Sequence, residues 1–163
     1  MTSSSTLRRA VVIPALLAVS LAGASSALAA EPATAATTRS VVVAGTGTLA
    51  AHGSGVARLG GSYALVGSMD GGSIRIVGAT AFTTIRVTGW ASKTRLADGT
   101  LIFRGVHGTY FILGRSIRTT IESTKMRFVA TGHGRVLLRG RGEYWVNGHG
   151  PFPWSTLGVE PAF

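Results

Sequence analysis

The stretch from Gly132 to Gly150 reads GHGRVLLRGRGEYWVNGHG, and its regularly spaced glycines indicate how the chain folds. Gly-x-Gly elements occur here three times and earlier twice, at 132–134, 140–142, 148–150, 45–47 and 53–55. Within each region the elements recur every eight residues, an even spacing that keeps the glycines on one face of an extended chain. Glycine inside a strand marks a bend or a close backbone approach. We therefore expect long strands that bend around a curved sheet.

The rest of the chain also has the pattern of strands. From Val41 onward, no window of eleven or more residues places apolar side chains at helical spacing. Short runs rich in Val, Ile, Thr and Phe alternate with glycine instead, which is typical of strands. Acid–glycine steps at Asp70-Gly71 and Asp98-Gly99 predict hairpin turns, because glycine accepts a positive φ. The expected strands are 41–50, 55–66, 73–78, 83–90, 100–104, 108–113, 117–122, 125–131, 134–139 and 142–147.

An internal repeat accompanies these strands. All three tyrosines lie in a Gly-x-Tyr-x-x-x-Gly pattern, at 61–67, 108–114 and 142–148, and each tyrosine is expected to face the core. The fold class that follows is all-β: a single antiparallel β-sandwich or barrel-like domain of about ten glycine-punctuated strands. The alternative is a β-solenoid or β-roll, which is less favoured because the repeats are unevenly spaced.

The start of the chain has the three regions of a secretory signal. Arg8 and Arg9 precede an apolar stretch over 10–24, and small residues follow up to Ala30. We expect residues 1–29 to be a cleavable bacterial signal peptide and 30–40 a flexible lead-in. Residues 41–163 are then the domain, with an aromatic and proline-rich tail over 148–163. An uncleaved anchor is the alternative, and the export route stays open between general secretion and the twin-arginine pathway.

Composition narrows the location and the class of protein. The chain has no cysteine, which excludes disulfides and a lipid-modified cysteine, and no second apolar run is long enough to span a membrane. We therefore expect a secreted or cell-envelope-associated protein outside the cytoplasm. Without Arg8 and Arg9, 14 basic residues face 6 acidic ones, so the expected mature domain is strongly basic.

Catalytic and metal sites have little support in the sequence. The chain contains no Gly-x-Ser-x-Gly elbow, and its four histidines match no compact ligand spacing. Glu122 and Glu143 are the only carboxylates on expected strands that could form a hydrolytic pair. We predict no catalytic residue, no metal and no cofactor. An enzyme whose site is assembled from distant residues remains an alternative.

The basic residues suggest a binding surface. On one regular strand, Arg135, Arg139, Arg141 and Trp145 would share a single face. Lys125 and Arg127 share a face of the preceding strand, and Arg115 and Arg118 lie just upstream. The polyanion-binding candidates are therefore Lys125, Arg127, Arg135, Arg139, Arg141 and Trp145. The competing interpretation is that these arginines only keep an exported protein soluble.

These features lead to a functional expectation. Arginine forks bind sulfate, phosphate and carboxylate groups, so an anionic polysaccharide or wall polymer is the expected partner. Sequence-specific nucleic-acid recognition is not expected, because phosphate contacts carry little sequence preference. The favoured function is an exported, non-enzymatic module that binds anionic envelope or extracellular polymers. A structural or self-assembling envelope protein is the first alternative, and an enzyme is the second.

Overall fold

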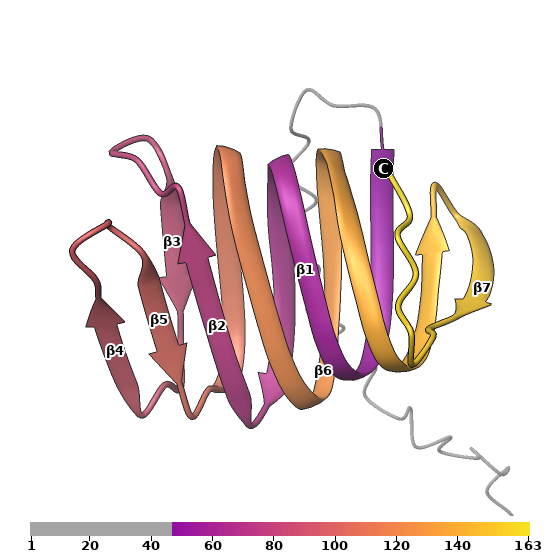
Figure 1. Ribbon diagram of the computed structural model, residues 1–163, viewed down its shortest axis with the longest axis horizontal. Coiled ribbons are helices and arrows are strands. Elements are labelled where there is room, and N and C mark those ends of the chain that lie inside the picture. Colours follow the sequence, from indigo (N-terminus) through magenta and orange to yellow (C-terminus); the bar gives the residue numbers. More distant parts are fainter. Residues whose placement is uncertain (1–46) are drawn as a thin grey trace, which may run out of the picture. The chain divides into compact units, whose positions relative to one another are not determined.

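The computed structural model describes residues 47–163, which are dominated by β-strands. The predicted signal peptide, the lead-in and the first part of the 41–50 strand lie outside these residues. No helix long and apolar enough to cross a membrane occurs among the residues described. The seven strands are β1 (Gly47–Asp70), β2 (Gly72–Val77), β3 (Thr84–Val87), β4 (Ser92–Arg95), β5 (Leu101–Arg104), β6 (His107–Val146) and β7 (His149–Pro153) (Figure 1).

The strands form one antiparallel sheet that is not closed. Its main order is β1-β6-β2-β5-β4, and both β3 and β7 pair with β6. The all-β prediction is confirmed, whereas a sandwich or barrel of about ten strands is not. The strand count differs because neighbouring predicted strands are continuous: β1 has 24 residues, and the last five predicted strands are all parts of the 40-residue β6.

β1 and β6 coil around each other, as Figure 1 shows. Most residues of β1 pair with β6 on both sides; Leu49, for example, lies opposite both Ala130 and Val146. Conversely, the 126–132 segment of β6 lies between the 47–53 and 63–69 segments of β1. The long strands therefore pass repeatedly from one side of the coil to the other.

We call the two sides of the coil the first and second walls. The first wall comprises β4, β5, β2, 117–123 of β6, 55–61 of β1 and 134–140 of β6. The second comprises β3, 107–114 of β6, 63–70 of β1, 126–132 of β6, 47–53 of β1, 142–146 of β6 and β7. Each long strand contributes to both walls, and the core lies between them.

Glycine allows the strands to bend between the walls without leaving the sheet. Gly61 has a φ of 144° and lies opposite Gly134, and a Cβ on Gly61 would overlap the carbonyl oxygen of His133. Few side chains tolerate such a φ, and none fits so close a backbone approach. The expectation of long strands bent at glycines is thus met in β1 and β6.

The core is formed by the inward side chains of both walls. Tyr63 of the second wall is fully buried and donates a hydrogen bond to the Thr119 hydroxyl of the first wall, at 2.9 Å. Tyr110 is also buried, and Tyr144 packs at the margin of the core. The largest fully buried aliphatic side chains are Leu49, Leu59, Leu65, Ile74, Ile76, Ile112, Ile117, Ile121 and Leu138.

Two strands lie outside the predicted set, and one predicted hairpin is a different kind of turn. β4 reads Ser-Lys-Thr-Arg and is exposed throughout, so no alternation marks it, and β7 contains two prolines. Both are edge strands, where prolines and charges are tolerated. Asp98-Gly99 connects the paired strands β4 and β5, as predicted for a hairpin. Asp70-Gly71 instead links β1 to β2, which do not pair with each other.

Candidate functional site

The outer surface of the first wall carries six exposed arginines, which we call the arginine face. They extend from β5 at one side to the 134–140 segment of β6 at the other. Each is adjacent in sequence to at least one inward, buried residue, so strand alternation directs it to solvent. The arginine face consists of Arg58, Arg75, Arg104, Arg118, Arg135 and Arg139.

The register staggers these arginines. Arg58 lies opposite Thr120 on one side and Leu137 on the other, and Arg118 and Arg135 both lie opposite Gly60. No arginine of the face lies directly opposite another one. Diagonal neighbours on a sheet are about 7–8 Å apart, and residues two strands apart are separated by about 10 Å. The stagger limits repulsion and leaves spaces for anionic groups between guanidinium groups.

The positive charge of this face is almost uncompensated. Glu122, which lies between Ser73 and Val56, is its single carboxylate. Within residues 47–163, the basic side chains that lie within 4.0 Å of a carboxylate are His52, beside Glu143, and His107, beside Asp70, so no arginine forms an ion pair. Arg139 donates its Nε–H to the carbonyl oxygen of Thr156 at 3.0 Å, which ties one guanidinium to the tail. The face therefore presents six cations against Glu122, and Asp98 of the β4–β5 turn also lies within electrostatic range of Arg75.

Gly60 leaves an opening in the middle of the face. Its φ is not in the positive range, and a Cβ built on it would contact no atom within 4 Å. Neither backbone conformation nor space requires glycine there. Because no side chain rises between Arg118 and Arg135, both guanidinium groups can reach the same bound anion.

The structure divides the six predicted binding residues among three places. Arg135 and Arg139 lie on the arginine face, and Trp145 lies on the second wall, opposite Ala50. Lys125, Arg127 and Arg141 line a groove at one end of the coil.

The expected single face of Arg135, Arg139, Arg141 and Trp145 is therefore incorrect. Gly140 and Gly142 have φ values of 136° and 157°, and β6 bends there from the first wall to the second. The outward surfaces of the two walls face opposite directions. Alternation within β6 is retained, but an outward side chain before the bend and one after it do not share a surface.

Sequence reasoning missed half of the arginine face. Arg58, Arg75 and Arg104 are not among the sequence candidates, and Arg118 appears there only as a neighbour of the basic region. Each of the three sits beside buried residues in an alternating run, as in Ile74-Arg75-Ile76, which marks it as outward-facing. The local pattern does not say which wall carries the run, so only the register groups these arginines.

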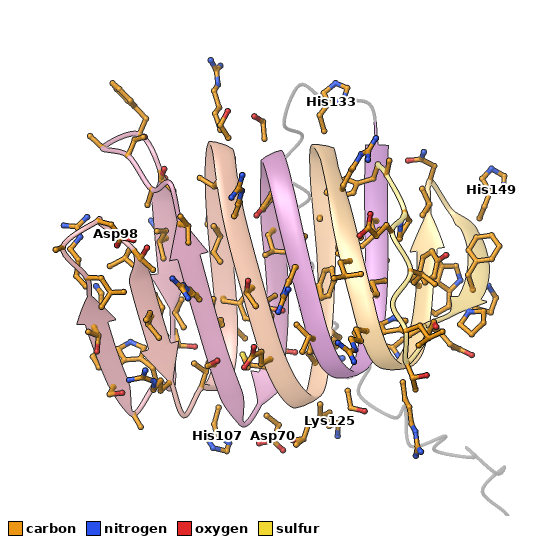
Figure 2. The ribbon with its side chains drawn as sticks, in the orientation of Figure 1. Asp70, Asp98, His107, Lys125, His133 and His149 are labelled. Atoms are coloured by element: carbon orange, nitrogen blue, oxygen red, sulfur yellow. The ribbon has the colours of Figure 1, made fainter. Side chains whose placement is uncertain are left out.

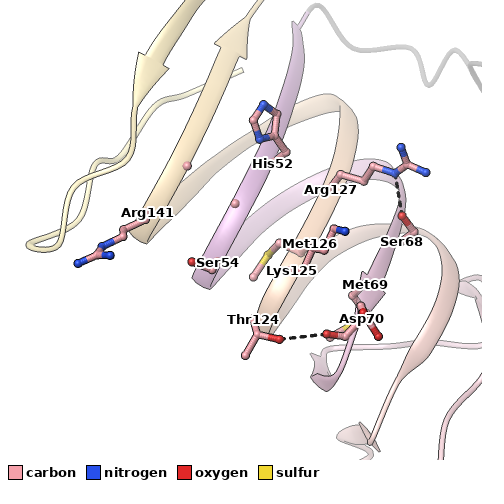
Figure 3. Close-up of a pocket in the computed structure, with 12 residues that line it drawn as sticks. His52, Ser54, Ser68, Met69, Asp70, Thr124, Lys125, Met126, Arg127 and Arg141 are labelled. Carbon is pink, nitrogen blue, oxygen red and sulfur yellow. Dashed lines mark hydrogen bonds between the residues drawn. The ribbon is translucent and has the colours of Figure 1, made fainter.

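The end groove has a volume of about 760 Å³ and is open to solvent (Figure 3). Residues 52–54 and 68–70 of β1 line it together with 124–127 and 141–142 of β6. His107, Asp70 and Lys125 lie at this end of the coil, and His133 lies at the other (Figure 2). The groove thus gathers charged residues that are far apart in sequence.

The remaining catalytic candidates do not form a common site. Glu122 lies on the first wall, and Glu143 lies on the second, opposite His52, so the two carboxylates do not flank one bond. In the described part of the chain, no group of three or more His, Asp or Glu side chains could hold a metal ion. The two glutamates therefore share no position where a substrate could bind between them.

No protein-family model, curated protein or solved structure shows a significant match to this chain.

Proposed function

We propose that this protein is an exported, non-enzymatic module that binds an anionic polysaccharide or wall polymer through the arginine face. The observation that carries the proposal is the staggered array of six exposed arginines, which has one carboxylate among them and no ion pair to an arginine within residues 47–163. Guanidinium groups bind carboxylate, sulfate and phosphate by paired hydrogen bonds, which a lysine ammonium cannot reproduce.

The extent of the face favours a polymer over a small ligand. Arg104 and Arg139 lie four strand spacings apart, a distance of about 19 Å. The surface between them is one side of a sheet and not a cavity, so many weak contacts would have to add up along an extended ligand. A chain that carries one acidic group every few ångströms suits this arrangement.

Two further parts of the proposal come from the sequence and the packing. Export and an envelope or extracellular location rest on the signal peptide predicted for residues 1–29. For the fold, we propose that the two walls act as a sandwich-like pair, which the hydrogen bond from Tyr63 to Thr119 across the core supports. A rigid core of this kind would keep the arginine array flat.

The test compares two variants of equal net charge. The face variant is Arg58→Gln/Arg118→Gln/Arg135→Gln, and the control is Arg86→Gln/Arg95→Gln/Arg115→Gln, whose arginines are equally exposed but lie outside the face. Binding of the chain without residues 1–29 to heparin, and to a phosphate-bearing wall polymer, is measured across a salt series.

The face variant should bind more weakly than the control, and its salt dependence should be shallower. The slope of log K against log salt is negative. For a polymer with the charge density of DNA, its magnitude decreases by about 0.9 for each phosphate that the protein no longer neutralises. Equal binding and equal slopes in the two variants would mean that the arginines act only through net charge, and the proposal would then fail.

A further inference from the structure

The end groove carries three cations that the polymer-binding face does not use. Lys125, Arg127 and Arg141 all come from β6, and the groove brings them to the end where β1 turns into β2. Figure 3 shows Lys125 and Arg127 on one side of the groove, whereas the Arg141 side chain points away from the other labelled residues. Lys125 and Arg127 are therefore the pair positioned to share a ligand.

Hydrogen bonds hold this pair in place. Arg127 donates its Nε–H to the Ser68 hydroxyl at 2.9 Å, which leaves the terminal nitrogens of the guanidinium directed outward. Ser123 and Thr124 anchor the bend before Lys125, because their hydroxyls bond to the carbonyl oxygens of Gly71 and Asp70 at 2.6 and 3.1 Å. These bonds connect the bend to the β1–β2 turn, and they therefore hold the backbone next to Lys125 in position.

The carboxylates around the groove are largely satisfied by histidines. Asp70 Oδ1 lies 2.8 Å from His107 Nδ1, and Glu143 lies 3.5 Å from His52 Nε2. Neither carboxylate forms an ion pair with Lys125 or Arg127. The lining contains three cations and one carboxylate, so the groove is positive, while Asp70 leaves one carboxylate oxygen on the rim as a hydrogen-bond acceptor.

The other lining groups define the chemistry of the ligand. Ser54 and Thr124 add hydroxyls to the lining, whereas Met69 and Met126 lie behind it in the core. A bare phosphate would gain from the two cations but would be repelled by Asp70. A sugar with one acidic group fits these features, because its acid meets the cations and its hydroxyls meet Asp70 and Ser54.

We infer that the end groove binds an acidic sugar unit, with Lys125 and Arg127 on the acidic group and Asp70 on a ring hydroxyl. The volume of about 760 Å³ lies in the range of small-ligand sites and accommodates one or two sugar rings. This site is separate from the arginine face and does not depend on it. The sugar can come from the end of an anionic polysaccharide or from a free acidic monosaccharide.

Calorimetric titration tests the inference with four probes: a galacturonic acid trimer, galacturonic acid, the neutral galactose trimer and inorganic phosphate. The trimer and the monomer of galacturonic acid should bind more tightly than the neutral trimer and phosphate. Tighter binding of the trimer than of the monomer assigns the groove to a polymer end, and equal binding assigns it to a free sugar. Phosphate that binds as tightly as the acidic sugars would overturn the inference.

Variants identify the residues. Lys125→Gln/Arg127→Gln should weaken galacturonate binding about tenfold or more, because each substitution removes a charged hydrogen bond. Lys125→Gln alone provides a second measurement that leaves the Arg127–Ser68 bond intact, and it should also weaken binding. Unchanged affinity in both would overturn the inference.

Asp70→Asn separates a sugar site from a simple anion site. This change removes a negative charge, so it should strengthen phosphate binding while it weakens galacturonate binding. Stronger binding of both probes would contradict the assigned role of Asp70. The Arg58→Gln/Arg118→Gln/Arg135→Gln variant should keep galacturonate affinity, so a failure of polymer binding and a failure of the groove give different results.

Discussion

At the residue scale, Tyr63 is the polar group on which the core depends most. Its ring is fully buried, and its hydroxyl lies 2.9 Å from the Thr119 hydroxyl and 3.4 Å from the Leu59 carbonyl oxygen. Burial raises the pKa of Tyr63 from 10.0 to about 12, although the bond to Thr119 partly opposes the shift. Burial also raises the pKa of Tyr110. Burial thus favours the neutral form of both tyrosines in the folded protein.

The raised pKa of Tyr63 predicts a loss of stability in alkali. Between pH 10 and 12 the unfolded chain ionises this tyrosine, whereas the folded chain keeps it neutral, so rising pH favours unfolding. The contribution of Tyr63 to the free energy of unfolding is fully present below pH 10 and is lost as the pH rises through 12. At pH 11 its share of the loss is on the order of 1 kcal/mol relative to pH 8. Urea unfolding at the two pH values measures the loss, which should be smaller in Tyr63→Phe; an equal loss in both proteins would contradict the assignment.

The last residue of the chain is expected to matter for stability. Phe163 is 8% exposed, its ring centroid lies 6.4 Å from that of Tyr63, and it covers Gly47 and Gly134. Phe163→Ala should lower the free energy of unfolding by about 3 kcal/mol, because it removes a packed aromatic ring. The control is Phe82→Ala at a position that is 94% exposed, where the change should stay within about 0.5 kcal/mol. Urea denaturation of the two variants gives the comparison, and similar losses would argue against a packed tail.

At the element scale, the long strands bend where a backbone approaches too closely for a side chain. The 24 residues of β1 and 40 residues of β6 stay hydrogen-bonded through these bends. Because the bend glycines retain ladder pairing, each strand serves both walls. The ten short strands expected from the sequence are therefore joined into fewer, longer ones.

Two adjacent glycines of β1 allow a matched test of this role. Gly61→Ala should lower the free energy of unfolding by about 2 kcal/mol or more, because its φ of 144° and the nearby His133 carbonyl oxygen oppose a Cβ. Gly60→Ala should instead raise it by about 0.5 kcal/mol, since that position has an ordinary φ and free space. Chemical denaturation reports both values. Equal effects at the two positions would rule out the bend as the cause.

At the scale of the whole molecule, the β4 and β7 edges of the sheet and the 134–140 segment of β6 carry features that oppose pairing with another chain. The β4 edge carries Lys93 and Arg95, and β7 carries Pro151 and Pro153. The tail hydrogen-bonds to the 134–140 segment of β6, with Phe163 and Gly134 exchanging both backbone bonds at 2.9 and 3.0 Å. Charges, prolines and covering segments are the usual protections of edge strands. The presence of these features on the β4 and β7 edges favours the proposal of a polymer-binding protein over that of a self-assembling protein.

Removing the charges of β4 should create a self-associating protein. Lys93→Val/Arg95→Val leaves an uncharged edge of high β-propensity, so we expect dimers or larger species in light scattering as the concentration rises. The control, Ser92→Val/Thr94→Val, adds the same residue type to the same strand but keeps both charges. It should stay at the size of the wild type. Association of the control to the same degree would show that apolarity, and not charge loss, controls the edge.

Some of this organisation could be predicted from local sequence. The absence of helical spacing, the strand-like runs and the glycines every eight residues indicated an all-β chain with bent strands, because side-chain alternation and backbone freedom are local properties. Alternation also marks Arg75 and Arg118 as outward-facing. β4 could not be found in this way, since all four of its residues are exposed and show no pattern.

The sequence by itself therefore determined the all-β class, the bends and which side chains point inward or outward. The tertiary structure alone decided which outward residues share a surface. Arg58 and Arg135 are 77 positions apart in sequence but diagonal neighbours on the first wall, whereas Arg139 and Trp145 are close in sequence and lie on opposite walls. The reason is physical: strand alternation repeats every two residues along one chain, but the pairing of β1 with β6 depends on how the whole coil packs around its core.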